Sequence, residues 1–189
     1  VDADGNALRW MWVDVYSPTT HNWHGASTDD NGNYRVSVDD GAYIVKVEGW
    51  DSTGNKTYQT KYYNNATSEF AATPVIVSGS DVEGINFSMS GGNSIGGTIT
   101  GIAQGDQVWL DVWSDTVNAW GGIEVGGSGS GSDDFTITGL NQTADFRLNV
   151  WAEGYISGQY VGTVGGEATA PGDWSNATLL DTTSGSVSG

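Results

Sequence analysis

Aromatic and acidic side chains alternate in two short stretches of the sequence, in a pattern that could bind a ligand. The members are Trp12, Asp14 and Tyr16 in the first stretch and Trp109, Asp111 and Trp113 in the second. Residues two positions apart on a β-strand point to the same face, so each stretch would present its rings and its carboxylate together. Aromatic rings with a polar atom can stack on sugar rings, and a carboxylate accepts hydrogen bonds from hydroxyl groups. The pattern therefore predicts an aromatic platform suited to a polysaccharide.

Two other interpretations fit the same aromatic residues. With one further Trp after each stretch, the candidate set is Trp12, Tyr16, Trp23, Trp109, Trp113 and Trp120. Trp and Tyr are enriched where proteins meet, so the rings could be buried between neighbouring units or copies of the chain. They could also pair across the strands of one sheet. The sequence leaves all three interpretations open.

Acidic turns are a second kind of candidate site. Closely spaced oxygen ligands suit a hard cation such as calcium. The candidate ligands are Asp2, Asp4 and Asn6 in one turn and Asp29, Asp30 and Asn31 in the other. An EF-hand needs a Glu at a fixed distance after its first Asp, and neither turn has one. Turn residues that simply face solvent are the competing explanation.

Residues for catalysis are scarce. The chain contains no Cys and two His. On a strand, His21 and His24 would point to opposite faces because they are three positions apart. No Ser–His–Asp arrangement, phosphate-binding loop or zinc-binding helix motif appears. We therefore expect a protein that is not an enzyme and that needs no cofactor apart from the calcium considered above.

The charge balance excludes several partners. Six Lys and Arg stand against 23 Asp and Glu, which gives a net charge of -17. A nucleic-acid binder needs a basic surface, and anionic lipid surfaces would repel this chain. No apolar run approaches the roughly 20 residues of a membrane-spanning helix. A low Lys content with abundant Asp, Asn, Gly, Ser and Thr is typical of an extracellular protein, whose copies would repel each other unless cations screen them.

The sequence contains an internal repeat. Residues 12–25 read WVDVYSPTTHNWHG, and residues 109–122 read WLDVWSDTVNAWGG, with an offset of 97 and no gap. With small insertions, residues 32–36 then match residues 133–137, and residues 43–47 match residues 146–150. Two homologous units with a border near residues 91–93 follow from this repeat.

Both units have the sequence pattern of antiparallel β-sheet. Apolar residues alternate with polar or aromatic ones in residues 11–16, 43–48 and 108–113. Period-two patterns of this kind indicate half-buried strands, and turn clusters rich in Asp, Asn and Gly separate them. The core is predicted to contain Val13, Val15, Val45, Val47, Leu110, Val112, Leu148 and Val150. Short strands at this spacing favour an all-β fold of two tandem prealbumin-like or Ig-like β-sandwich units.

The turns of the first unit support a family resemblance. The relevant segments are residues 2–8 (DADGNAL), 28–34 (TDDNGNY), 40–45 (DGAYIV) and 81–87 (DVEGINF). They resemble the carboxypeptidase regulatory-like domains and the related B-type repeats of bacterial surface adhesins. The resemblance covers most of residues 1–90 and is weaker in residues 94–183. It implies a seven- or eight-stranded prealbumin-like sandwich that serves as a spacer or stalk and sometimes as a binding module.

The two ends of the chain fit each other. The second unit opens with a predicted strand at residues 94–100, and the first unit has no counterpart of this strand before Val1. Residues 186–189 followed by Val1 and Asp2 align without a gap with residues 94–99. A sandwich that lacks a strand exposes an unpaired edge, which a strand from another copy can cover. The predicted donated strand consists of Ser184, Gly185, Ser186, Val187, Ser188 and Gly189, and a disordered tail is the alternative.

These observations predict residues 1–92 as the first unit, residues 93–183 as the second, and residues 184–189 as a donated strand or linker. The predicted function is that of a non-enzymatic extracellular structural protein, whose copies join head to tail in a filament or stalk. Such contacts propagate, because donor and acceptor surfaces differ. The copies could be separate subunits or periods of one tandem chain. A carbohydrate-binding or adhesive module that uses the surface Trp and Tyr is the alternative function.

Overall fold

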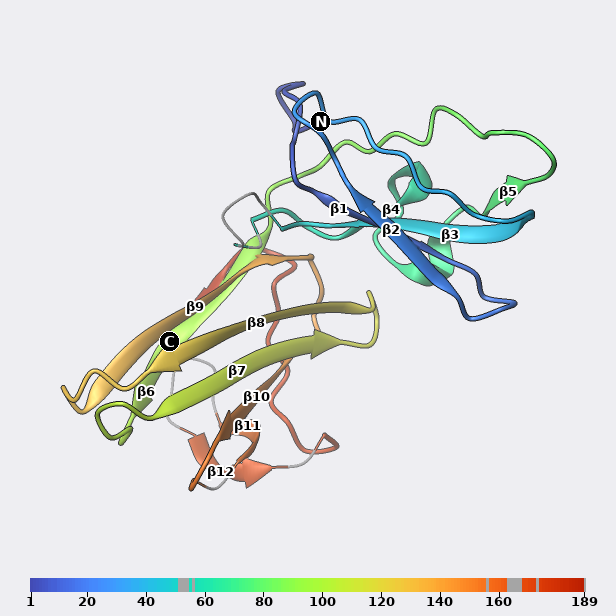
Figure 1. Cartoon of the computed structure of the whole chain (residues 1–189). Coiled ribbons are helices and arrows are strands. Elements are labelled where there is room, and N and C mark those ends of the chain that lie inside the picture. The colour runs from blue at the N-terminus through green and yellow to red at the C-terminus, as the bar shows by residue number, and fades with distance from the viewer. Residues whose placement is uncertain (51–54, 56, 156, 163–167, 173, 189) are drawn as a thin grey trace. The chain divides into compact units, whose positions relative to one another are not determined.

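The computed structural model describes residues 1–50, 55, 57–155, 157–162, 168–172 and 174–188. The chain divides into two compact units, Val1–Gly92 and Asn93–Gly189, which Figure 1 shows in blue to green and in green to red. Each unit is described below by itself. Within the described residues, the helical elements of the chain are two single 3₁₀ turns, and no helix is long and apolar enough to cross a membrane.

The first unit is built on one antiparallel sheet. Its strands are β1 (Trp12–Tyr16), β2 (Trp23–Ser27), β3 (Gly41–Glu48), β4 (Lys61–Tyr62) and β5 (Val75–Val77). Their order is β2-β1-β3-β4, and β5 pairs with the start of β3. Strand β1 lies between β2 and β3, where Val13 pairs with Val47 and Val15 with Val45. The alternation of the sequence thus places these Val residues on one buried face, where they form the core of the unit.

The second unit has two sheets. The larger contains β7 (Gln107–Ser114), β8 (Ala119–Gly126), β10 (Arg147–Ala152), β11 (Gly158–Gly162) and β12 (Ala168–Gly172), in the order β12-β11-β10-β7-β8. The smaller contains β6 (Asn93–Thr100), β9 (Ser132–Leu140) and β13 (Val187–Ser188), in the order β13-β6-β9. Strand β9 pairs antiparallel with β6, whereas β13 pairs parallel with it. Phe146, Leu110 and Ile137 are fully enclosed in the core of this unit.

The expected all-β sandwich is confirmed, and the repeat appears in the strand pairing. Strand β7 lies between β8 and β10 just as β1 lies between β2 and β3. Leu110 pairs with Val150 at the positions where Val13 pairs with Val47 in the first unit. Of the eight predicted core residues, Val13, Val15, Val45, Val47, Leu110, Val112 and Leu148 are buried, and Val150 is half-buried.

Within the described residues, the first unit has no counterpart of the smaller sheet of the second unit. Residues 33–38, the counterpart of β9, are extended, with Tyr34, Val36 and Val38 half-buried and their neighbours exposed. Residues 85–89 alternate in the same way, and Phe87 and Met89 are buried. In the part of the chain that the structure describes, neither segment forms a ladder with another strand. The first unit therefore has the two outer strands of a sheet without the central strand that β6 provides in the second.

Candidate functional site

An open groove lies between these two unpaired segments of the first unit. Its volume is about 460 Å³, and residues 32–38 and 81–86 form its two walls. Its floor is apolar and is made by Val15, Val45, Val75 and Val77. Because the walls have no strand partner among the described residues and the floor is aliphatic, the groove has the chemistry of a site for one β-strand.

The second unit explains the shape of this groove. There, β6 fills the equivalent position between β9 and β13, and its Ile95 is 2% exposed in the core. The repeat offset of 97 makes Val1 the counterpart of Thr98. In this alignment, residues 94–97, which form the first half of β6, correspond to positions before Val1. The groove is the counterpart of the space that residues 94–97 fill in the second unit.

Val1 pairs with residues 87–89, directly after one wall of the groove, and this pairing defines the direction of any strand that continues it. Its amino group donates a hydrogen bond to the carbonyl of Phe87 (3.0 Å), and the amide of Met89 donates to the carbonyl of Val1 (2.8 Å). Two bonds that bracket Ser88 in this way are the pattern of parallel strands. A strand that ends at Val1 therefore runs parallel to residues 85–88, as β6 runs parallel to β13.

Tyr34 spans the groove. Its hydroxyl donates a hydrogen bond to the carbonyl of Ile85 (2.7 Å), so that it joins one wall to the other. Burial raises the pKa of Tyr34 to about 12, and the phenol stays neutral at physiological pH. The counterpart of Tyr34 in the second unit is Phe135, whose ring lies against Gly97 of β6. Tyr34 thus occupies part of the space of the missing strand.

The predicted donated strand pairs within its own unit in the single chain. Residues 187 and 188 form β13, where Val187 lies beside Ile95 and Ser188 beside Gly96. Ser186 also accepts a hydrogen bond from the amide of Ser94 (3.0 Å), and Val187 packs against the core of the second unit. This location differs from the predicted one because the Ser-Val-Ser pattern also fits the last strand of a unit. Donation to another copy stays a prediction, and Gly189 lies outside the described residues.

The aromatic candidates of the first unit pair across strands. The rings of Tyr16 and Trp23 stack with their centroids 4.4 Å apart. Trp12 is 43% exposed, lies over Gly25, and donates from its Nε1 to Asp14 (2.7 Å). A Cβ on Gly25 would come within 2.6 Å of the Trp12 ring, which explains why a residue without a side chain stands there.

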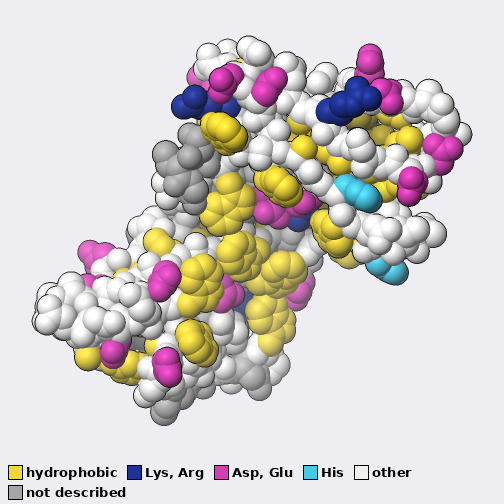
Figure 2. Space-filling view, viewed as in Figure 1, with side chains coloured by type: hydrophobic (Ala, Val, Ile, Leu, Met, Phe, Trp, Pro, Cys, Tyr) yellow, Lys and Arg dark blue, Asp and Glu magenta, His cyan; other side chains and the backbone are white. Residues whose placement is uncertain are grey.

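The aromatic candidates of the second unit lie on the outer face of β7 and β8. Trp109 and Trp120 stack at 6.3 Å over Gly122, where a Cβ would clash with both rings, and Trp113 is half-buried beside Trp120. Figure 2 shows hydrophobic side chains gathered on this face. Alternation along β10 places exposed Trp151 opposite Trp109, a neighbour that the sequence analysis did not include.

A polar row crosses the same face. Asn149 donates from Nδ2 to Asp111 (3.0 Å) and accepts from Nε2 of Gln159 (3.0 Å). Asn149 and Gln159 come from β10 and β11, far from the aromatic stretch in sequence. Only strand register brings them beside Asp111, so spacing along the chain gave no signal for them.

The acidic turns use their carboxylates locally. Asp2 accepts hydrogen bonds from the amides of Asp4 and Asn6, and Asp29 accepts them from the amides of Asn31 and Asn33. These bonds stabilise the turn at residues 2–6, which precedes β1, and the turn at residues 29–33, which follows β2. Among the described residues, no group of three or more His, Asp or Glu is placed to hold a metal ion. His21 bonds to the hydroxyl of Tyr16 instead (2.8 Å).

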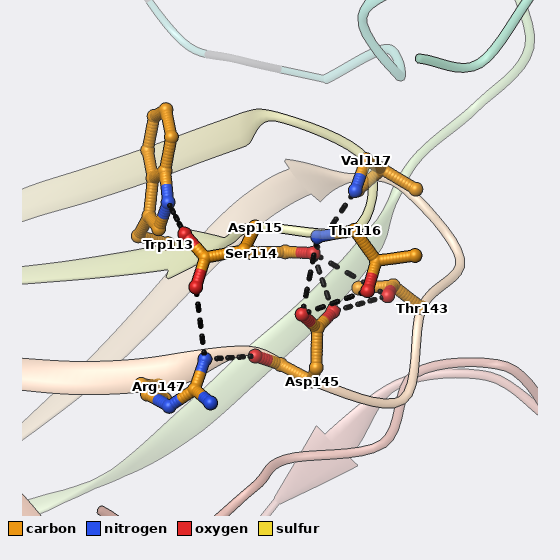
Figure 3. Close-up of polar contacts among 8 residues, drawn as sticks. All are labelled: Trp113, Ser114, Asp115, Thr116, Val117, Thr143, Asp145 and Arg147. Atoms are coloured by element: carbon orange, nitrogen blue, oxygen red, sulfur yellow. Dashed lines mark hydrogen bonds and ion pairs between the residues drawn. The ribbon is translucent and has the colours of Figure 1, made fainter. Parts of the chain in front are cut away.

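Asp145 is the centre of a polar cluster that the sequence analysis missed (Figure 3). Its carboxylate accepts hydrogen bonds from the hydroxyls of Ser114, Thr143 and Thr116, and from the amide of Thr116. The cluster ties the turn between β7 and β8 to the loop before β10. Burial raises the pKa of Asp145, but these hydrogen bonds outweigh it, so the pKa of this carboxyl lies below its ordinary value of 3.8.

The second unit is therefore expected to lose stability in acid through Asp145. A lowered folded pKa stabilises the protein above the unfolded value of 3.8, and this contribution disappears as the pH falls through the folded pKa. Asp145→Asn should cost about 1 kcal/mol at neutral pH, at the low end for charged hydrogen bonds because the carboxyl is partly exposed. It should also flatten the melting temperature of the second unit between about pH 5 and pH 2. Asp181→Asn is the control, since Asp181 is exposed and, among the described residues, accepts hydrogen bonds only from Thr183 of its own turn. An equal loss in both variants would contradict this role.

Comparison with known proteins gives only weak likeness. No protein-family model matches the chain, and no curated protein matches it. Among solved structures, a Streptococcal ancillary pilin is similar with a TM-score of 0.35 and 13% sequence identity. The match covers 99% of this chain and 60% of that chain, so this chain spans less than two thirds of the pilin structure. A likeness of this size carries no argument about function, and the proposal below rests on the groove.

Proposed function

We propose that the chain is a structural protein of an extracellular filament or stalk, in which copies join head to tail by strand complementation. The observation that supports this most directly is the open groove of the first unit. Its walls leave backbone groups of two segments without a strand partner, which is costly for a sheet and makes the edge a template for pairing. A strand from a second copy would supply these partners and cover the aliphatic floor.

The donor that we propose is the carboxyl-terminal segment of residues 184–189. In its own unit it is an outer strand of only two paired residues, Val187 and Ser188. It can leave without removing a central strand, whereas β6 is held along its length by β9. Donor and acceptor surfaces then lie on different units, so each added copy exposes a new groove and the assembly grows as a fibre.

Removal of the donor is expected to abolish assembly. A chain that lacks residues 184–189 should stay monomeric in electron micrographs and in light scattering at about 0.15 M salt, where the Debye length of about 8 Å screens the charges of the copies. Val187→Asp should have the same effect, because it places a charge where the strand meets an apolar floor. Ser184→Ala, at an exposed position, is the matched control and should assemble. Fibres formed equally well by all of these chains would refute the proposal.

Polysaccharide binding is the second candidate function, favoured by the outer face of β7, β8 and β10. There the half-buried rings of Trp109 and Trp120 are tilted by only 21° to each other, beside the row of Asp111, Asn149 and Gln159. A flat aromatic surface beside amide and carboxylate groups suits the alternating apolar and hydroxyl faces of a sugar chain. Quenching of Trp fluorescence by a polysaccharide, in a chain that forms no fibres, would favour this function over the first.

A further inference from the structure

The hydrogen bonds of Val1 define the register of an incoming strand against one wall of the groove. Val1 lies beside Ser88 in a parallel arrangement. Counting back along a strand that ends at Val1, the third residue before Val1 therefore lies beside Ile85. This register comes from the first unit alone and does not use the repeat.

The repeat defines the register against the other wall. In the second unit, Ile95 of β6 lies opposite Ile137 of β9. Residue 137 corresponds to Val36, and Ile95 stands three residues before Thr98, the counterpart of Val1. The third residue before Val1 therefore faces Val36. The two walls agree, and both assign the same residue of the strand to the centre of the groove.

The second unit also indicates which side chain the incoming strand needs at the centre of the groove. In the second unit, Ile95 lies between Ile137 and Val187, a row of three aliphatic residues. In the groove, Val36 and Ile85 flank the empty place, so an aliphatic residue completes the same kind of row.

The residue of the incoming strand that lies next to Val1 has a different steric requirement. A Cβ on Gly97 would come within 3.0 Å of the Phe135 ring, and Tyr34 is the counterpart of Phe135. A residue without a side chain therefore fits best beside Tyr34. An aliphatic residue, any residue and then Gly is the pattern that fits the groove.

We infer that the groove is a binding site for a strand of this pattern, and that Val187 of a second copy lies in it between Val36 and Ile85. This inference rests on the proposed function and names the segment and register of the partner. Residues 187–189 read Val-Ser-Gly, which supplies the aliphatic residue and the Gly at the required places. The strand runs antiparallel to residues 33–38 and parallel to residues 85–88.

Exchange of this strand is favoured by the number of ladders that it forms. In its own unit, β13 is an outer strand, and its partner in the described part of the chain is β6. In the groove, the same residues have a backbone partner on both sides and replace the bond from the Tyr34 hydroxyl to Ile85. The ion pair of Arg35 with Asp81 also joins the two walls, at the exposed side of the groove. The exchange therefore converts a one-sided strand into a central one and closes the sheet of the first unit.

Engineered cysteines test this register in the full chain. The chain has no Cys, so any disulfide reports the introduced pair. Facing residues of antiparallel strands have Cα atoms about 4.5–5.5 Å apart, within the range of a disulfide. Val36→Cys combined with Val187→Cys should give, on mild oxidation, a ladder of linked copies on a denaturing gel that a reductant dissolves. Ile85→Cys with Val187→Cys should give the same ladder through the other wall.

Phe70→Cys with Val187→Cys is the control, because Phe70 belongs to the first unit, is 89% exposed and is not among the residues that line the groove. It should give at least tenfold less linked product. Equal linkage in the control, or chains that remain single with both Val36→Cys and Ile85→Cys, would overturn the inference. Linked copies that close into rings instead of fibres would support the strand register and refute the filament, so the two proposals can fail separately.

Discussion

A chain whose last six residues are moved in front of Val1 is expected to stay monomeric and to melt at a higher temperature in its first unit. The moved sequence Ser-Gly-Ser-Val-Ser-Gly would then enter the groove of its own chain, with its Val between Val36 and Ile85. Burial of one Val side chain contributes at least about 1.5 kcal/mol. For a unit of 92 residues, this corresponds to a rise in melting temperature of about 6–12 °C. Differential scanning calorimetry would measure it.

The comparison that isolates this effect is the chain in which residues 184–189 are deleted and not replaced. Both chains lack β13, so any loss of stability in the second unit is common to them. A third chain, with Asp in place of the moved Val, should melt like the simple deletion. A rise in melting temperature that survives this Asp would mean that the added residues stabilise the unit without entering the groove.

Phe146→Ala is expected to destabilise the second unit by about 3–5 kcal/mol, the usual range when a large buried side chain is truncated. Phe146 is 0% exposed and packs in the core between the two sheets of this unit. The melting temperature of the second unit should fall by at least about 12 °C. The transition of the first unit should be unchanged, because its core contains none of the contacts of Phe146.

Phe70→Ala is the matched control. Phe70 belongs to the first unit and is 89% exposed, so its truncation should change the free energy of unfolding by less than about 0.5 kcal/mol. Chemical denaturation monitored by Trp fluorescence would give both values. A small effect of Phe146→Ala would mean that the core of the second unit collapses around the cavity.

Much of the fold could be predicted from the sequence, because the apolar–polar alternation and the internal repeat both indicate which strand residues face the core. The Val residues of β1 and β3 alternate with polar neighbours, and a strand with one buried face must have this period. The offset of 97 also placed Trp109 and Trp120 on equivalent strands. These features depend on local pattern, which a single sequence contains.

The pairing of the short end strands could not be predicted in the same way. Residues 186–189 match the first strand of a unit in sequence, and yet Val187 pairs with Ile95 as the last strand of its own unit. Three or four small residues fit the first strand of a unit as well as the last one. Only pairing with neighbouring strands decides between the two positions. Asp145 and Gln159 were missed for a related reason, because their partners come from other strands and loops.

The parallel pairing of β6 with β13 has a mechanical consequence. Strand β6 begins the second unit and β13 ends it, so tension along the chain pulls on the start of one strand and the end of the other. Parallel strands that are pulled at opposite ends slide past each other, and all the hydrogen bonds between them are strained at once instead of opening one by one. Val1 and Ser88 have the same arrangement in the first unit. In the single chain, tension on the two ends of a unit thus loads this contact in shear, and its hydrogen bonds must break together.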